Sequence, residues 1–375
     1  MGARPAWAEV DLGAIRHNAA LLAALAAPAG LCAVVKAAGY GHGSVPVARA
    51  AIEGGATWLA VALVEEGAVL RGHGLDAPVL LLSEPPVDSM GEVVALGLTP
   101  TVYTHEGVEA AAKAAAAAGT GPLAVHVKVD TGMHRVGASP SDAPAVVQAV
   151  VEHPELTLGG VWTHFAVADE PDHPFTTQQC GRFQAVLDDL DGRGVRPPLV
   201  HAANSAGALA HPGARFDLVR CGIALYGVSP SPALAALEPV TALRPALSLR
   251  ARVSFVKRVG PGEAVSYGLR RPLQQEATIA TVPVGYADGV PWRLGVSGGE
   301  VLIGGRRRAL AGSVTMDQIL VDCGDDTGVL PGDEVVLLGR QGTDEISAWD
   351  WAGRTGTIAY EILCGIGPRV PKIYG

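Results

Sequence analysis

The chain has 375 residues, of which 49% are hydrophobic and 17% charged, and its formal net charge at pH 7 is −9. This length allows one large domain with a smaller one, or two domains, and the apolar content disfavours disorder. The negative balance argues against nucleic acid and anionic membranes as partners. Five scattered cysteines without a CxxC pair are typical of a reduced cytoplasmic protein, and the N-terminus has no apolar signal core.

Residues 30–225 alternate between short apolar runs and longer segments with helical spacing. Eight runs are candidate strands: 31–36, 58–61, 78–82, 99–102, 124–129, 156–163, 199–202 and 218–221. Segments between them carry apolar residues at spacings of three and four and end in Gly or Pro; they include 87–97, 106–118, 143–152 and 175–192. This alternation predicts a (β/α)8 barrel, assigned to residues 11–236, with a doubly wound sheet as the alternative.

The pattern changes after a predicted linker that contains prolines at 230, 232, 239 and 245. The segments 247–260, 278–289, 300–310, 314–324 and 333–339 are β-branched, partly alternating and bounded by glycine turns. One helix is plausible at 347–353. Residues 237–375 are therefore predicted to form a mostly antiparallel β domain, which the N-terminal strand 1–10 is a candidate to join.

A lysine ends the first apolar run, in LCAVVKAAGYGHG at 31–43. Lys36 has two readings: a solvated lysine beside a tight turn, or an amine in a partly desolvated pocket, where a lowered pKa makes it a nucleophile toward carbonyls. The three glycines that follow would let backbone N–H groups approach an anion. This stretch alone favours the first reading.

Further candidate site residues lie at or just after the ends of the predicted strands, where barrel enzymes carry their chemistry. These are Tyr40, Lys128, Asp130, Arg135, His164, His201, Asn204, Ser205, Arg220, Gly222 and Ile223. Taken singly, these residues also have purely structural explanations. Lys128 could be a charge at a strand edge, His164 a buried core imidazole, and Asn204 and Ser205 a helix N-cap. Arg220 could form an ion pair with Asp217. Together, these residues favour a site at one barrel mouth.

Nine motifs resemble those of alanine racemases, in the same order and at similar spacing. They are VVKAAGYGHG, VKVDTGMHRVG, THF, ANSA, FDLVRCGIALYG, VSYG, PVGYADGV, VTMDQ and the closing TIAYEI…RVPKIY. The resemblance covers nearly the whole chain. It implies a pyridoxal 5′-phosphate enzyme that interconverts L- and D-alanine for peptidoglycan. It also implies a cytoplasmic homodimer in which the partner's second domain closes each active site.

The resemblance assigns two catalytic residues. Lys36 would form the internal aldimine and, once freed by substrate, act as the base on the D-alanine face, while Tyr267 would serve the L-alanine face. Two opposed bases are needed because racemisation removes a proton from one face and returns it to the other. A phenol with a pKa of about 10 is a poor base at neutral pH, so a hydrogen bond from His164, next to Arg220, would assist Tyr267.

Arg220 would face the pyridine nitrogen of the cofactor. Because arginine is always charged and has no acceptor, it would keep that nitrogen unprotonated and weaken the electron sink, which suppresses transamination. Further cofactor-binding candidates are Tyr40, His164, Asn204, Ser205, Gly222, Ile223 and Tyr360, with the phosphate held by Tyr40, Ser205, Tyr360 and the backbone at Gly222 and Ile223.

Substrate-binding candidates come from both domains. Arg135 resembles an arginine that contacts the substrate carboxylate and the cofactor's phenolic oxygen, and Lys128 matches a lysine that is carbamylated in many relatives. From the partner subunit, Met316 would offer its backbone N–H to the carboxylate, Asp317 would lie beside it, and Tyr286 would line the entrance. No metal is expected, since no histidine has HExxH-type spacing.

Four residues depart from the family pattern: Ala38, His134, Cys221 and Ser313. They leave the proposed catalytic groups intact and affect fine positioning. A broader racemase acting on serine is the main alternative function. A decarboxylase on this fold is disfavoured by the VSYG base and Arg220, and a non-catalytic pyridoxal-phosphate homeostasis protein by the presence of a second domain.

Overall fold

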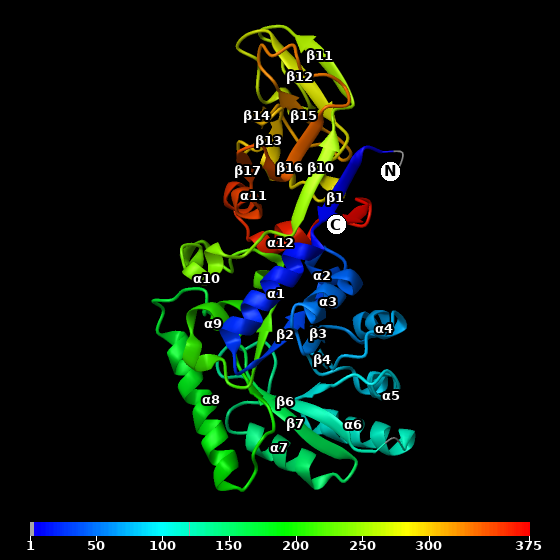
Figure 1. The fold of residues 1–375 in the computed structure, drawn as a ribbon, viewed down its shortest axis with the longest axis vertical. Coiled ribbons are helices and arrows are strands. Elements are labelled where there is room, and N and C mark those ends of the chain that lie inside the picture. Colours follow the sequence, from blue (N-terminus) through cyan, green and yellow to red (C-terminus); the bar gives the residue numbers. More distant parts are fainter. Residues whose placement is uncertain (1–3, 120) are drawn as a thin grey trace. The chain divides into compact units, whose positions relative to one another are not determined.

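The computed structural model describes residues 4–119 and 121–375, which form two compact units (Figure 1). Residues 13–39 and 44–244 make up what we call the barrel unit. Residues 4–12, 40–43 and 245–375 make up the sheet unit. Among the described residues, no helix combines the length and the apolar character needed to cross a bilayer.

The barrel unit is a ring of parallel strands in chain order. Two four-stranded sheets, β4-β3-β2-β9 and β5-β6-β7-β8, are joined at one edge by Leu81 N to Thr99 O (2.9 Å) and at the other by Asp217 N to Val200 O (2.9 Å). The predicted (β/α)8 barrel is thereby confirmed. The strands are β2 (Gly30–Val34), β3 (Trp58–Val61), β4 (Val79–Leu81), β5 (Thr101–Val102), β6 (Leu123–Lys128), β7 (Leu156–Trp162), β8 (Val200–His201) and β9 (Leu218–Cys221).

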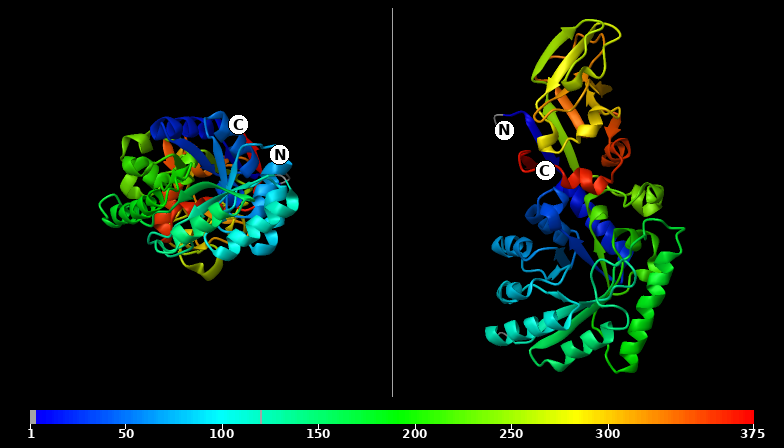
Figure 2. Two further views of the ribbon diagram at one scale, coloured as in Figure 1. Left: turned by 90° about the horizontal axis from the view of Figure 1, so that it is seen from below. Right: turned by 180° about the vertical axis from the view of Figure 1, so that it is seen from behind.

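Helices surround these strands (Figures 1 and 2), because each buries an apolar stripe against the sheet. In α6 the Thr104 side chain caps the first turn by accepting a hydrogen bond from Gly107 N (2.9 Å), and Gly119 ends the helix in a left-handed conformation. The helices are α1 (Leu12–Ala26), α3 (Ser44–Glu53), α4 (Val64–Gly72), α5 (Met90–Ala95), α6 (His105–Ala118), α7 (Ala143–Glu152), α8 (Phe175–Gly192), α9 (Ser205–Ala210) and α10 (Glu238–Thr241). The segment labelled α2 (Lys36–Tyr40) is a turn with left-handed backbone angles.

Several sequence-based boundaries coincide with the structure, and others shift. The strands predicted at 58–61 and 218–221 and the helices at 143–152 and 175–192 have those bounds. The run at 31–36 is a strand only to Val34, because the chain turns at Lys36. The helix predicted at 87–97 is a short 3-10 turn, Val87–Ser89, followed by α5.

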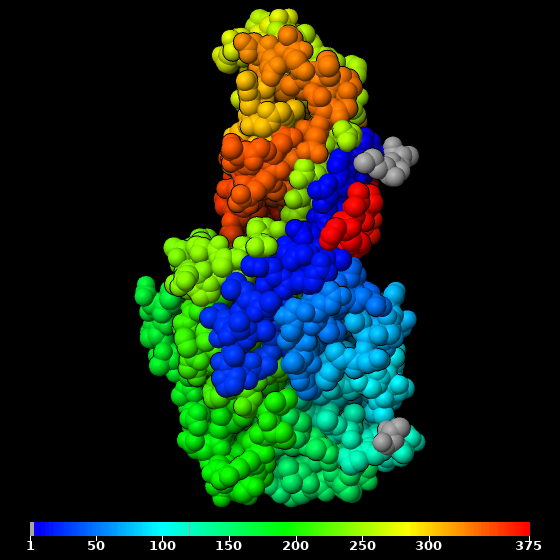
Figure 3. All heavy atoms as spheres, in the orientation of Figure 1, coloured from blue at the N-terminus to red at the C-terminus, as the bar shows by residue number. Residues whose placement is uncertain are grey.

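The sheet unit is built on one sheet of order β11-β12-β15-β14-β13-β16-β10-β1-β18, with β17 paired to β16. The pairs are antiparallel except β1 with β18, and Figure 3 shows the N-terminal and C-terminal segments side by side. The elements are β1 (Ala6–Val10), β10 (Leu247–Arg252), β11 (Phe255–Val259), β12 (Ala277–Val282), β13 (Glu300–Ile303), β14 (Arg306–Leu310), β15 (Ile319–Asp322), β16 (Glu334–Gln341), β17 (Asp344–Ile346), β18 (Lys372–Tyr374), α11 (Ala348–Thr355) and α12 (Ala359–Cys364).

Residues 237–244 lie with the barrel unit, so the boundary falls after 244 and not after 236 as predicted. Two side chains of α1 hold this segment. His17 Nε2 lies 3.0 Å from Ala242 O, and the Asn18 amide bonds both the N–H and the carbonyl of Arg244 at 2.8 Å. These contacts join positions far apart in sequence, which local patterns do not report.

Candidate active site

Lys36 lies in a left-handed turn that follows β2. Ala37 (φ 51°, ψ 53°), Ala38 (φ 51°, ψ 42°) and Gly39 (φ 63°, ψ 49°) all have left-handed backbone angles. For residues with a Cβ this conformation is costly and must be held by surrounding contacts. One such contact is Glu66 of α4, whose carboxylate accepts hydrogen bonds from Ala37 N (2.6 Å), Ala62 N (2.8 Å) and Leu63 N (3.2 Å).

The barrel brings a cluster of cations to the neighbourhood of Lys36. Lys128 is 3% exposed, with its Nζ 4.4 Å from the centroid of the Trp162 ring. Burial first, and then the charges of Arg220, Arg135 and Lys36, lower the pKa of Lys128 to about 7, while Asp130 opposes them. Lys36, Arg135 and Arg220 are therefore close enough to Lys128 to interact with it electrostatically.

Arg220 is held in the barrel interior at 2% exposure. Its Nη2 donates to the carbonyls of Thr163 (2.8 Å) and Ala202 (3.1 Å) and lies 3.2 Å from His164 Nδ1. Burial lowers the pKa of Arg220 to about 10, which still leaves it a cation at neutral pH. Burial, and secondly Arg220, lower the pKa of His164 well below its ordinary value, so this imidazole is neutral.

The alternative reading of Arg220 as the ion-pair partner of Asp217 is wrong. Asp217 Oδ2 instead accepts a hydrogen bond from Val200 N at 2.8 Å, and none of the hydrogen bonds given above for Arg220 reaches Asp217. Asp217 thus stabilises the start of β8, and Arg220 makes its hydrogen bonds inside the barrel.

Hydrogen bonds connect the residues that follow β8 with those that follow β9. The Asn204 side chain accepts from Gly207 N (2.9 Å), so it is the N-cap of α9. Ser205 Oγ accepts from Gly222 N (2.9 Å) and Ala224 N (3.3 Å), which ties α9 to the turn that opens at Ile223. Asn204 can cap the helix and also bind a ligand, because the cap uses the side-chain oxygen and the side-chain N–H groups can still donate.

Tyr40 and Tyr360 come together in the sheet unit, with ring centroids 6.3 Å apart. The turn that carries Tyr40 packs closely on α12: a Cβ on Gly41, where φ is 82°, would lie 2.3 Å from Leu363 O. Only glycine fits this approach.

The second group of predicted residues also lies in the sheet unit. Ser266 Oγ donates to Ser313 O (2.6 Å) and Ser313 Oγ donates to Tyr267 O (2.9 Å), so Ser313 clamps the Tyr267 turn. Tyr286 N bonds Thr315 O (3.0 Å), which brings Tyr286 beside the loop of Met316. These hydrogen bonds place Tyr267, Tyr286 and Met316 on adjoining loops.

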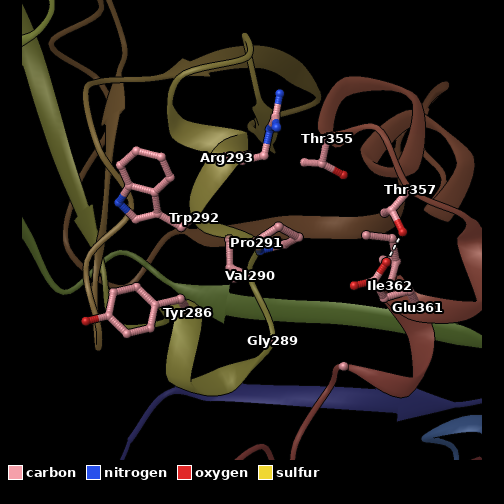
Figure 4. A pocket seen from close by; sticks show the side chains of 11 residues that line it. Tyr286, Gly289, Val290, Pro291, Trp292, Arg293, Thr355, Thr357, Glu361 and Ile362 are labelled. Atoms are coloured by element: carbon pink, nitrogen blue, oxygen red, sulfur yellow. Dashed lines mark hydrogen bonds between the residues drawn. The ribbon is translucent and has the colours of Figure 1, made fainter.

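Asp317 is committed to an ion pair with Arg369, at 2.6 Å. Tyr286 lines a cavity of about 390 Å³ with Trp292 on the same side and the hydrogen-bonded pair Thr357 and Glu361 on the other (Figure 4).

Two of the four departures from the family pattern occupy backbone positions with positive φ. Ala38 (φ 51°) and His134 (φ 53°) have left-handed angles, for which Asn and Gly are favoured. His134 is supported by Asp130, whose Oδ1 accepts from His134 N (3.0 Å). Cys221 is buried in β9, opposite Ala33 of β2.

Sequence reasoning missed Glu66 entirely and gave His201 no role. The barrel also places His126 of β6 next to His201, with 2.9 Å between their nitrogens. For Glu66, a Glu at the third position of a helix was an available signal, since it marks a capping box. No local signal pointed to His126.

Comparison with known proteins agrees with this geometry. The chain matches the family described as alanine racemase, N-terminal domain, over residues 10–230, and that described as alanine racemase, C-terminal domain, over 246–374. It is 48% identical to the alanine racemase of Symbiobacterium thermophilum, covering 100% of this chain and 98% of that protein, and 47% identical to that of Thermobifida fusca, covering 98% of each.

Solved structures give the same result. The crystal structure of alanine racemase from D-cycloserine-producing Streptomyces lavendulae has a TM-score of 0.94 at 41% identity, covering 100% of this chain and 98% of the other. That from Bacillus anthracis with bound L-Ala-P has a TM-score of 0.92 at 40% identity, covering 100% and 96%. Barrel, β domain and relatives define a pyridoxal-phosphate-dependent isomerase. The chain belongs to the alanine racemase family.

Proposed function

We propose that this enzyme interconverts L- and D-alanine with Lys36 and Tyr267 as the two bases. The observation that carries the proposal is the position of Lys36, at the end of β2 in a held turn and within the electrostatic reach of Lys128 and His164.

The donors at the barrel mouth fit pyridoxal 5′-phosphate. The cofactor supplies the electron sink for the substrate Cα. Its aldehyde matches the Lys36 amine, and its anionic groups match the guanidinium cations of Arg135 and Arg220, whose charges both act on Lys128. We assign the phosphate to Tyr40, Ser205, Gly222, Ile223 and Tyr360, and further cofactor contacts to His164 and Asn204.

Arg220 would donate a hydrogen bond to the pyridine nitrogen and keep it unprotonated. Its buried position supports this role, because a cation fixed by carbonyls and imidazoles cannot turn away to water. His164, held neutral beside Arg220, would be able to hydrogen-bond the Tyr267 phenol.

We further propose a homodimer in which Tyr267 reaches the Lys36 of the partner. Within one chain the Tyr267 side chain is 77% exposed, Met316 52% and Tyr286 45%. Large apolar side chains exposed together on one unit mark an interaction surface. Met316 N–H and Arg135 would bind the substrate carboxylate, Asp317 would lie beside Met316, and Tyr286 would line the entrance.

Lys128 is proposed to carry a carbamate. With its pKa at about 7, about half of its amines or more are neutral at pH 7 and above, and a neutral amine adds to carbon dioxide. The carbamic acid formed loses a proton, and the resulting anion would fix Arg135. D-alanine supply for peptidoglycan in the cytoplasm is the proposed setting. Free thiols at Cys32, Cys180, Cys221 and Cys323 fit such a reducing compartment.

Exchange of the alanine α-proton in deuterated water tests the two-base assignment. We expect the wild-type chain to exchange both enantiomers. Tyr267→Phe should slow exchange from L-alanine by at least about 100-fold, the usual contribution of a positioned base, and Lys36→Ala should abolish exchange. Equal rates for the two enantiomers in Tyr267→Phe, both unchanged, would refute the role of Tyr267. Serine is assayed in parallel, because exchange of its α-proton at a rate similar to that of alanine would indicate a racemase of broader specificity.

A further inference from the structure

A row of three buried side chains crosses the barrel interior. Arg220 Nη1 lies 2.8 Å from His201 Nδ1, and His201 Nε2 lies 2.9 Å from His126 Nδ1. Their exposures are 2%, 0% and 1%. No role described above involves His126, and buried imidazole pairs are costly unless both rings are hydrogen-bonded.

The chemistry of arginine fixes the direction of each hydrogen bond in this row. A guanidinium has N–H donors and no acceptor, so His201 must accept at Nδ1. A neutral His201 then carries its proton on Nε2 and donates it to His126 Nδ1. His126 in turn carries its proton on Nε2, an atom that has no hydrogen-bond partner among the described residues.

Both imidazoles stay neutral, so protonation does not disturb this order. Burial, and secondly Arg220, lower the pKa of His126 to about 3 and that of His201 well below its ordinary value. The groups that face the pair are Arg220, which disfavours a second positive charge, and the rings of Trp58 and Trp162.

The barrel makes room for the pair. A Cβ on Gly160 of β7 would lie 2.9 Å from the His126 ring, and one on Gly159 would lie 3.0 Å from it, closer than side chains normally approach. Trp162 stacks on His201 at 5.5 Å with an interplanar angle of 7°. Two consecutive glycines in a central strand weaken it, and here they accommodate one imidazole.

We propose that His126 is a positioning residue that holds Arg220 through His201. Its Nδ1 keeps His201 in the Nε2–H tautomer and in one orientation, so that His201 Nδ1 always presents a lone pair to Arg220. Without this acceptor, His201 can turn or change tautomer, and Arg220 Nη1 becomes a buried donor without a partner. An effect of His126 on the cofactor's reactions rests on the proposed role of Arg220 at the pyridine nitrogen.

Two variants of nearly equal shape test the proposal in the cofactor-loaded enzyme. His126→Asn places an acceptor, Oδ1, near the position of Nδ1, whereas His126→Leu removes it. The readout is side transamination, in which alanine becomes pyruvate and the cofactor aldehyde becomes an amine, counted per racemisation turnover. A hydrogen bond is worth about 0.5–1.5 kcal/mol, so His126→Leu should raise this ratio about 2- to 12-fold. His126→Asn should stay near wild type, and equal ratios in both variants overturn the proposal.

A second measurement uses the wild-type holoenzyme and does not depend on whether the variants fold. Nitrogen-15 NMR of the imidazoles should show neutral Nε2–H tautomers for His126 and His201 at every pH from about 5 to 9. A proton on His201 Nδ1 overturns the proposal. Arg220→Gln separates the two possible failures: if side transamination does not change in this variant, the assigned role of Arg220 is wrong, whereas the NMR result still judges His126.

Discussion

The barrel interior changes the acid–base behaviour of a single side chain, Lys128, more than its sequence context suggests. The amine is 3% exposed and lies over the face of Trp162. Burial is the main reason that its pKa falls from 10.5 to about 7. A cation–π contact favours the charged form, but here it does not outweigh burial and the neighbouring cations.

This shift predicts a pH-dependent stability. Between pH of about 7 and 10.5 the unfolded chain binds a proton at Lys128 and the folded chain does not, so the free energy of unfolding rises with pH in this window. Lys128→Met removes this contribution. The Met variant should be more stable than wild type at pH 7, and its advantage should shrink toward pH 10.5.

Urea unfolding in carbon-dioxide-free buffer measures this difference, because the carbamate would change the charge. Lys113→Met, at an exposed position of α6, is the control and should show no such trend. Parallel stability curves for wild type and Lys128→Met would contradict the lowered pKa of Lys128.

The backbone at Ala38 gives a second prediction for a single residue. Its left-handed angles (φ 51°, ψ 42°) cost about 1–2 kcal/mol for a residue with a Cβ, while glycine adds about 0.5–1 kcal/mol of unfolded-state entropy. Ala38→Gly should therefore stabilise the chain by about 0.5–1 kcal/mol in urea unfolding. Ala116→Gly, in the right-handed α6, should have the opposite sign, and destabilisation by both would show that the Ala38 turn is not strained.

At the scale of elements, the connection between β2 and α3 is stabilised by α4, the helix that follows the neighbouring strand β3. Glu66, in the first turn of α4, accepts hydrogen bonds from the backbone after β2 and after β3. Charge-assisted bonds of this kind are about twice as strong as neutral ones. One carboxylate thus couples the turn of Lys36 to the neighbouring strand.

Removing this carboxylate should loosen the Lys36 turn. We expect Glu66→Ala to lower the free energy of unfolding by about 1–3 kcal/mol, since three N–H groups lose their acceptor, and to speed the loss of cofactor on dilution. Glu66→Gln keeps one acceptor oxygen and should lie in between. Glu65→Ala, at the exposed neighbouring position, should resemble wild type. Cofactor retention in Glu66→Ala equal to that of Glu65→Ala would argue against the coupling.

At the scale of the whole molecule, the proposed dimer predicts complementation between two inactive chains. If Lys36 of one chain works with Tyr267 of the other, a mixed dimer of Lys36→Ala and Tyr267→Phe holds one intact site and one doubly altered site. Equal amounts, refolded together, should recover about a quarter of wild-type activity, because about half of the two-fold dimers are mixed.

The control replaces Lys36→Ala with the double variant Lys36→Ala, Tyr267→Phe, which should give no recovery with Tyr267→Phe. Failure of the single variants to complement, with mixed dimers demonstrated by mass spectrometry, would place both bases in one chain.

The sequence alone determined the barrel and the candidate residues at its strand ends. Runs such as 58–61 and 143–152 match β3 and α7, because hydrophobic periodicity reports which face of an element is buried. Lys36, His164 and Arg220 are candidates for the same reason: each follows a predicted strand or lies at its end, and parallel strands bring their carboxyl ends to one mouth.

Only the tertiary structure decided what holds these residues in place. Glu66 meets Ala37 across 29 positions, and His126 meets His201 across 75. The segment up to 244 joins the barrel unit through His17 and Asn18, more than 200 residues away. Hydrogen bonds between distant positions leave no periodic trace in a single sequence, so the supports of the site appear only when the chain is folded.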